Sequence, residues 1–96
     1  MSASSHTTAE RIERTVREAL AASHVEVIDE SWQHAGHAGA ASGGGHFIVH
    51  VVSPRFDGVA LIDRNRMVFR LFEQEMGREI HALTIKALTP DEWRSR

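Results

Sequence analysis

The stretch Phe47-Ile48-Val49-His50-Val51-Val52 decides the fold of this chain. It is almost continuously apolar and rich in β-branched residues, which is typical of a strand buried on both faces at the centre of a sheet. Residues 25–29 and 80–87 alternate between apolar and polar side chains and predict two further strands. No helical pattern separates residues 25–29 from the central stretch, so we expect these two strands to be antiparallel neighbours. The segment between the central stretch and residues 80–87 does contain a helical pattern, so these strands should be parallel.

Two long helices are predicted from the spacing of apolar residues. One runs from about residue 8 to residue 22, with charged residues on its other face. The other runs from residue 63 to residue 76, where Gly77 should end it. Phe56 lies before this second helix and should fill the turn that leads into it.

Helix starts are marked by two sets of polar residues. Thr7 and Glu10 have the spacing of a capping box, which leaves residues 1–6 as a disordered tail. A second capping box, Thr89-Pro90-Asp91-Glu92, predicts a short last helix that packs Trp93 onto the sheet. The predicted order is α-β-β-α-β-α. We therefore expect a small α+β domain over residues 7–96, with a three-stranded mixed sheet and helices on one side.

The composition narrows the class of protein. The chain has 96 residues, 42% hydrophobic and 25% charged, as expected for one globular domain. It has no apolar run long enough to span a bilayer, and its first ten residues have no signal or transit pattern. We therefore expect a cytoplasmic protein with no membrane partner. The absence of cysteine excludes disulfides and thiolate ligands from this chain, and a net charge of -2 argues against a purely electrostatic nucleic-acid binder.

Histidines are the residues of this chain that best suit a binding site. His34, His37 and His46 belong to a Gly/Ala-rich segment, residues 31–46, and His81 begins the last predicted strand. Imidazole is the commonest metal ligand in proteins. If the central and last strands are parallel neighbours, both begin at the same edge of the sheet. His81 and the glycine-rich segment should then share that edge, as half of a metal site that a partner completes.

Several segments together resemble the BolA family, in the same order and spacing over about residues 10–93. They are Asp29-Glu30-Ser31-Trp32-Gln33-His34, His46-Phe47, Arg55-Phe56-Asp57-Gly58, Arg64-Asn65-Arg66-Met67-Val68 and His81-Ala82-Leu83-Thr84-Ile85-Lys86-Ala87-Leu88-Thr89-Pro90-Asp91-Glu92-Trp93. The resemblance implies a fold related to the type II KH domain. Asn65 departs from the family pattern, which usually has histidine there.

For function, the resemblance implies a partnership with a monothiol glutaredoxin and a shared [2Fe-2S] cluster. The glutaredoxin supplies one cysteine and a bound glutathione supplies another thiolate. On this chain the matching ligands are His81 and the loop residue His34, for which His37 is a substitute. By themselves, His34 and His37 would more often be solvated loop residues.

Imidazole ligands would give such a cluster particular properties. Two imidazoles on one iron and two thiolates on the other form the Rieske pattern, in which neutral nitrogen raises the reduction potential. Imidazole ligates only when neutral, so binding should weaken as the pH falls towards about 6. Ordering a glycine-rich loop adds an entropic cost of about 1 kcal/mol or more per residue. These effects favour a labile cluster, suited to cluster trafficking or iron sensing.

No enzyme is predicted, because the chain lacks a nucleophile motif and a phosphate loop. A zinc site would need more fixed ligands than the histidine-containing loop supplies. The alternative function is a DNA-binding transcription regulator, as some bacterial BolA proteins are described. In that case Arg55, Arg64 and Arg66 would contact phosphates, or else an acidic partner surface, although a solvated helix face would explain each of them.

Two further expectations concern partners. The chain has no Gly-x-x-Gly loop of the kind with which KH domains hold nucleotides, which argues against RNA. Trp32, next to the expected loop ligand, either packs on the domain or anchors a partner. Alone, the protein should be a monomer or a weak homodimer.

Overall fold

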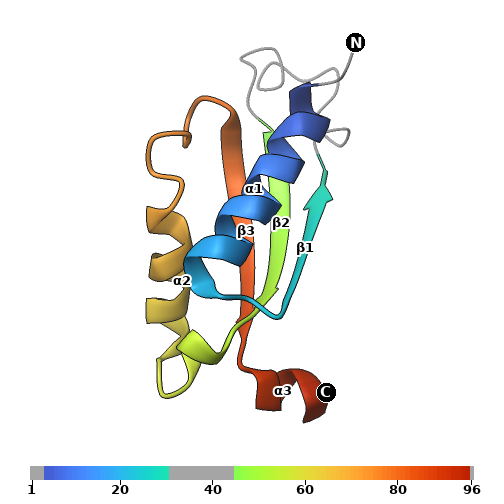
Figure 1. Ribbon diagram of the computed structural model, residues 1–96. Coiled ribbons are helices and arrows are strands. Elements are labelled where there is room, and N and C mark those ends of the chain that lie inside the picture. Colours follow the sequence, from blue (N-terminus) through green and yellow to red (C-terminus); the bar gives the residue numbers. More distant parts are fainter. Residues whose placement is uncertain (1–3, 31–44, 96) are drawn as a thin grey trace.

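The computed structural model describes residues 4–30 and 45–95, and Figure 1 shows the arrangement of their helices and strands. Along the chain these are α1 (Ser4–Leu20), β1 (His24–Asp29), β2 (Gly45–Val52), the short 3-10 helix η3 (Pro54–Phe56), α2 (Leu61–Arg70), β3 (Ile80–Leu88) and α3 (Pro90–Ser95). The predicted order of elements is confirmed. No helix among these residues is long and apolar enough to cross a membrane.

The sheet has the predicted topology, with β2 between β1 and β3. β1 runs antiparallel to β2, and β3 runs parallel to it. Val27 of β1 and Ile85 of β3 both lie opposite Val49, so the register across the sheet is defined at its centre. The apolar run of β2 therefore marks the central strand, as predicted.

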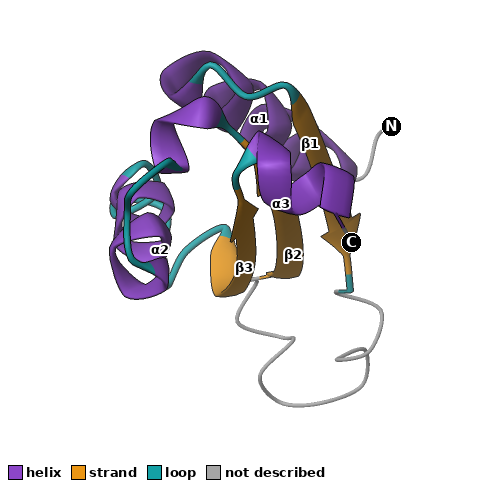
Figure 2. Cartoon of the chain, turned by 90° about the horizontal axis from the view of Figure 1, so that it is seen from below, coloured by secondary structure: helices purple, strands orange, loops and turns teal. Residues whose placement is uncertain are grey.

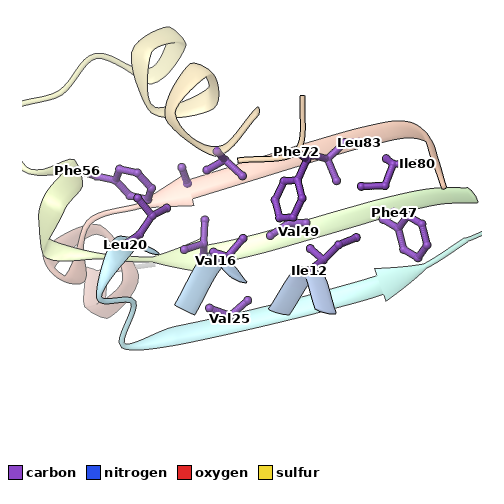
Figure 3. Packing of buried hydrophobic residues seen from close by; sticks show 13 residues of the cluster. Ile12, Val16, Leu20, Val25, Phe47, Val49, Phe56, Phe72, Ile80 and Leu83 are labelled. Atoms are coloured by element: carbon purple, nitrogen blue, oxygen red, sulfur yellow. The ribbon is translucent and has the colours of Figure 1, made fainter. Parts of the chain in front are cut away.

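The core lies between one face of the sheet and the two long helices. Figure 3 shows these side chains meeting in a common space, with α1 and β2 supplying the middle of the cluster. Phe56 is fully buried there, as predicted for a residue that fills the turn. Burying a side chain of this size contributes about 1.5–3 kcal/mol. The cluster contains Ile12, Val16, Leu20, Val25, Phe47, Val49, Val51, Phe56, Val68, Phe72, Ile80, Leu83 and Ala87.

The opposite face of the sheet is more open than the sequence predicted. Ile48 and His50 point away from the core and are only half-buried, so the prediction that β2 is buried on both faces is wrong for these positions. The reason is that α1 and α2 pack on the inner face only. α3 contacts the outer face near one end, where Trp93 stacks on His24 with ring centroids 4.5 Å apart and planes inclined by 25°. The predicted packing of Trp93 on the sheet is therefore confirmed.

The ends of the two long helices correct the sequence predictions. α1 begins at Ser4, so residues 4–6 are its first turn rather than a tail, and Thr7 lies inside the helix rather than at its cap. No residue between Ser4 and Thr7 breaks a helix, so nothing in the sequence stops α1 from starting early.

α2 ends at Arg70, six residues earlier than predicted. From Leu71 onward the backbone bonds tighten to the three-residue spacing, for example from the Phe72 N–H to the Phe69 carbonyl at 2.9 Å. Phe72 is nonetheless buried, because helical spacing of apolar residues reports which side of the chain faces the core. It does not report which hydrogen bonds the backbone makes. Gly77, with φ of 84°, turns the chain towards β3.

Candidate functional site

The edge of the sheet at which β2 and β3 begin and β1 ends is called here the open end, and it contains Glu30, His46 and His81. Figure 1 shows it at the top of the molecule, opposite α3. Gly45 lies beside Ile80 in the register, so the two parallel strands start together. The prediction that His81 lies at the edge where the glycine-rich segment joins the sheet is therefore confirmed.

His81 occupies an irregular position in β3. Between Gly45 and His46 the central strand advances by one residue, while its partner advances from Ile80 to Ala82. His81 is therefore the extra residue of a β-bulge, a feature that is rare in parallel pairs and is common beside functional sites. The bulge leaves Ile80 fully buried while His81 is exposed. The His81 imidazole thus projects from the start of β3, while the preceding residue, Ile80, stays in the core.

Glu30 and Gly45, which border residues 31–44 in the sequence, both lie at this same end. The Glu30 N–H donates to the His46 carbonyl at 2.8 Å, and the Gly45 N–H donates to the Glu79 carbonyl at 3.1 Å. These two bonds fix the positions at which the segment begins and ends. Its predicted site residues, Trp32, His34 and His37, lie outside the described residues.

His46 is held in place at the start of β2. Its Nδ1 lies 3.9 Å from Glu30 Oε1, and its Nε2 lies 3.4 Å from Thr84 Oγ1. These contacts join the last residue before the undescribed segment to the outer face of β3. They fix the position of the His46 ring next to the residue at which the described part of β1 ends.

The described residues of the open end do not form a metal site by themselves. Within residues 4–30 and 45–95, no group of three His, Asp or Glu side chains is arranged to hold a metal ion. The chain also has no cysteine. The described residues of the open end therefore offer an exposed imidazole at a defined position and no complete metal site of their own.

The opposite edge of the sheet is called here the anchored end, and it contains Ser53, Arg64, Thr89 and Glu92. Figure 2 looks along the sheet from this end, with α3 in front of the strands. The Ser53 hydroxyl donates to the Leu20 carbonyl at 2.5 Å and accepts the Arg55 N–H at 3.0 Å. This buried serine thereby ties the end of α1 to the start of η3.

Arg64 is the main correction to the predicted contact residues. Arg64 is only 7% exposed. Its guanidinium donates to the backbone carbonyls of Val59 at 2.7 Å and Ala87 at 3.1 Å. It also makes a two-pronged ion pair with Glu92, at 2.8 and 3.4 Å, and lies 5.9 Å from the centre of the Phe56 ring. The prediction that Arg64 contacts phosphates or a partner is wrong, because its donors are used inside the fold.

The capping box at the start of α3 is confirmed. The Thr89 N–H donates to Glu92 Oε1 at 2.9 Å, and the Glu92 N–H donates to Thr89 Oγ1 at 3.1 Å. The Arg64 guanidinium, followed by the Thr89 N–H, holds the pKa of Glu92 below its ordinary value. One carboxylate thus serves both the helix cap and the buried arginine.

The other predicted arginines are exposed on the surface of α2 and the turn before it. Arg66 pairs with Asp63 at 3.2 Å, and Arg55 is exposed in η3. Beside them, Leu61 and Ile62 are 65% and 60% exposed, which makes this surface partly apolar. Arg55 and Arg66 are available for contacts, whereas Arg64 is not.

The comparisons with known proteins agree with this fold. A family model described as BolA-like protein matches residues 16–92. The DNA-binding transcriptional regulator BolA of Escherichia coli is 39% identical over 84 residues, which are 88% of this chain and 77% of that protein. The SufE-like protein 1, chloroplastic/mitochondrial, of Arabidopsis thaliana is 38% identical over 87 residues, which are 85% of this chain and 24% of that protein.

A solved structure extends the agreement to three dimensions. The BolA domain of SufE1 from Arabidopsis thaliana matches with a TM-score of 0.76 and 37% identity, over 90% of this chain and 95% of that one. This protein therefore shares the small α+β fold of that domain, with a three-stranded mixed sheet. The family model, the sequence relatives and the shared fold lead to one conclusion: the chain belongs to the BolA family.

Proposed function

We propose that this protein is a non-enzymatic adaptor that pairs with a monothiol glutaredoxin and shares a labile [2Fe-2S] cluster with it in the cytoplasm. The observation that carries the proposal is the bulge at His81, which presents an exposed imidazole at the open end of the sheet. An isolated surface histidine needs no such irregularity in the strand. Bulges that re-aim one side chain are typical of functional positions.

The residues present fit one half of a cluster site. The described part of the open end supplies nitrogen from His81, and a chain without cysteine requires that thiolates come from the partner and its glutathione. Such a cluster supplies one-electron and iron-sulfur transfer chemistry when bound. The contribution of this chain is to place and orient imidazole ligands.

The second ligand in the proposal is His34, with His37 as its substitute. Four peptide units separate His34 from Glu30, so the chain spans at most about 14 Å between them. Glu30 is itself bonded to His46 at the open end, where β3 begins. The loop ligand and His81 thus belong to segments whose attachment points are neighbours, which supports their action on one cluster.

The test is anaerobic reconstitution with a monothiol glutaredoxin, glutathione, iron and sulfide. We expect an absorption and circular dichroism spectrum that differs from that of the glutaredoxin alone. In His81→Ala this heteromeric spectrum should disappear, because the variant lacks the imidazole that we propose as a cluster ligand. His34→Ala and His37→Ala rank the two loop histidines by how much of the spectrum each removes.

His50→Ala is the matched control, because it removes a half-buried histidine from the outer face of β2. It should leave the heteromeric spectrum unchanged. If wild type, His81→Ala and His50→Ala all give the spectrum of the glutaredoxin alone, the adaptor proposal is refuted. A loss in His50→Ala as large as that in His81→Ala would also refute the assignment of His81.

A second candidate function is DNA-binding transcription regulation, and its support is the name of the Escherichia coli relative. In this chain only Arg55 and Arg66, of the three predicted arginines, are exposed. Phosphate contacts by a few arginines give binding that falls steeply with salt. If the protein binds DNA, Arg55→Ala with Arg66→Ala should weaken binding and flatten its salt dependence. Unchanged titrations would exclude this surface as the DNA contact.

A further inference from the structure

The outer face of the sheet has an ordered pattern of side chains that the proposed cluster site does not use. Across the strands, Glu26 of β1, His50 of β2 and Lys86 of β3 form one row, as the register of both strand pairs shows. The next row towards the open end consists of Ile28, Ile48 and Thr84. An acidic and a basic residue therefore lie at opposite edges of the same row, and a mostly apolar row with two isoleucines lies beside them.

The two charges of this row have no ion-pair partner among the described residues. Glu26 and Lys86 are exposed, and neither makes an ion pair with any residue in the described part of the chain. Their Cα atoms are two strands apart, a separation of about 10 Å at the usual strand spacing. Ile28, in the next row, is 36% exposed, so apolar surface is also left open.

This arrangement is self-complementary under a two-fold rotation. Consider an axis that lies parallel to β2 between two sheets packed face to face. Rotation about it carries the β1 edge of one copy over the β3 edge of the other and preserves the rows. Glu26 of each copy then faces Lys86 of the other, Ile28 faces Thr84, and Ile48 and His50 face their own equivalents. Two-fold interfaces are isologous, so one complementary pair on a monomer is made twice in a dimer.

We infer that the outer face of the sheet is the self-association surface of this protein, and that its occupant is a second copy of the chain. The sheets pack face to face, as sandwich sheets do at about 10 Å. The two Glu26–Lys86 pairs select this orientation, and the apolar row supplies the buried contact. Figure 1 shows α3 beyond one end of the strands, so the two rows remain uncovered by the described helices.

The size of the face sets the strength of the dimer. The Cα atoms of the three strands and two rows span about 10 Å by 7 Å. The area of this face is therefore well below the roughly 800 Å² per partner that a standard interface buries. Exposed ion pairs add little affinity but discriminate strongly against wrong orientations. The dimer should therefore be weak, populated at high protein concentration and reduced by salt.

Sedimentation velocity over a concentration series, with the full chain, measures this association. Lys86→Glu and Glu26→Lys each place like charges opposite one another twice in the dimer, and each should raise the dissociation constant about tenfold or more. Mixing the two single variants restores opposite charges at both positions, so the mixture should dimerise although neither variant does alone. The double variant, which exchanges the two charges, should recover the wild-type constant.

Arg70→Glu is the matched control, since it reverses an exposed charge on α2, away from the sheet face. It should leave the dissociation constant unchanged. A protein that stays monomeric at every concentration would overturn the inference, as would a dimer that is insensitive to Lys86→Glu or a mixture that fails to associate. None of these results depends on the cluster proposal, because His81 lies outside both rows.

Discussion

At the anchored end, Ser53 donates to the backbone carbonyl of Leu20, and Arg64 donates to the backbone carbonyls of Val59 and Ala87. Arg64 also donates to the side-chain carboxylate of Glu92 in α3. At the open end, two side-chain contacts of His46 are longer, at 3.4 Å to Thr84 and 3.9 Å to Glu30. The same sheet thus has one end in which buried polar groups connect most elements and another in which a bulge interrupts the strand.

The difference shows that stabilising contacts are distributed unevenly between the two ends of this small domain. Local stability in proteins is uneven, and elements that move on binding come from the less stable regions. At the anchored end, the Arg64 side chain is buried and makes its hydrogen bonds inside the fold. The open end keeps an imidazole exposed and accepts weaker contacts there. The contrast can be measured by comparing the free energies of unfolding of variants that lack a side chain at one end or at the other.

The largest effect on stability is expected from Arg64→Met. This change removes the donors to the Val59 and Ala87 carbonyls and the partner of Glu92, and should lower the free energy of unfolding by about 2–4 kcal/mol. Urea unfolding followed by circular dichroism measures it. Arg66→Met, which removes an exposed pair with Asp63, should cost at most about 0.5 kcal/mol. Equal losses in the two variants would contradict the assignment of Arg64 as the centre of the anchored end.

A smaller effect is expected from Glu92→Gln, and it should depend on pH. Because the pKa of Glu92 is lowered in the folded protein, mainly by Arg64, its carboxylate stabilises the fold above the unfolded-state pKa of about 4.3. That contribution is lost as the pH falls through the lowered folded pKa. The difference in stability between wild type and Glu92→Gln should thus be constant near neutral pH and shrink below about pH 4.

Unfolding midpoints of both proteins across an acidic pH series provide this comparison. Glu73→Gln serves as the control, since Glu73 is exposed and makes no ion pair with any described residue. Its difference from wild type should stay small at every pH. A difference for Glu92→Gln that grows as the solution becomes more acidic would have the wrong sign for a lowered pKa.

The smallest effect on stability is expected from His81→Ala at the open end. His81 is exposed in a bulge, and such surface substitutions usually change the free energy of unfolding by less than about 0.5 kcal/mol. Thermal unfolding of the purified variant tests this. A decrease in the free energy of unfolding above about 1 kcal/mol would show that His81 stabilises the fold, and it would contradict the contrast between the two ends.

Strand order, direction and pairing could be predicted from the sequence because they depend on side-chain patterns that are local to each segment. The run at residues 47–52 indicated a central strand, and the helix between β2 and β3 indicated their parallel direction. The capping box of Thr89 and Glu92 is likewise local, since its two reciprocal bonds span only three residues. These features need no knowledge of what packs against them.

The environment of Arg64 could not be predicted in the same way, because it depends on how α3 packs against α2. Taken with Arg55, Arg66 and Arg70, it looked like one more exposed cation. A signal was nevertheless present: Arg64, Val68 and Phe72 are spaced four residues apart, which places Arg64 on the buried stripe of α2. The bulge at His81 had a weaker signal: the buried residues Ile80 and Leu83 are three positions apart, which breaks the two-residue period of a regular strand.

The bulge at His81 also bears on how this edge of the protein evolves. Residues in a regular strand are constrained on both sides by their neighbours, so a change of side chain there disturbs packing as well as chemistry. Here the flanking residues Ile80 and Leu83 keep their buried positions on either side of the irregularity. Position 81 is therefore a point at which a single codon change can alter the surface chemistry of the open end while the buried residues around it stay in place.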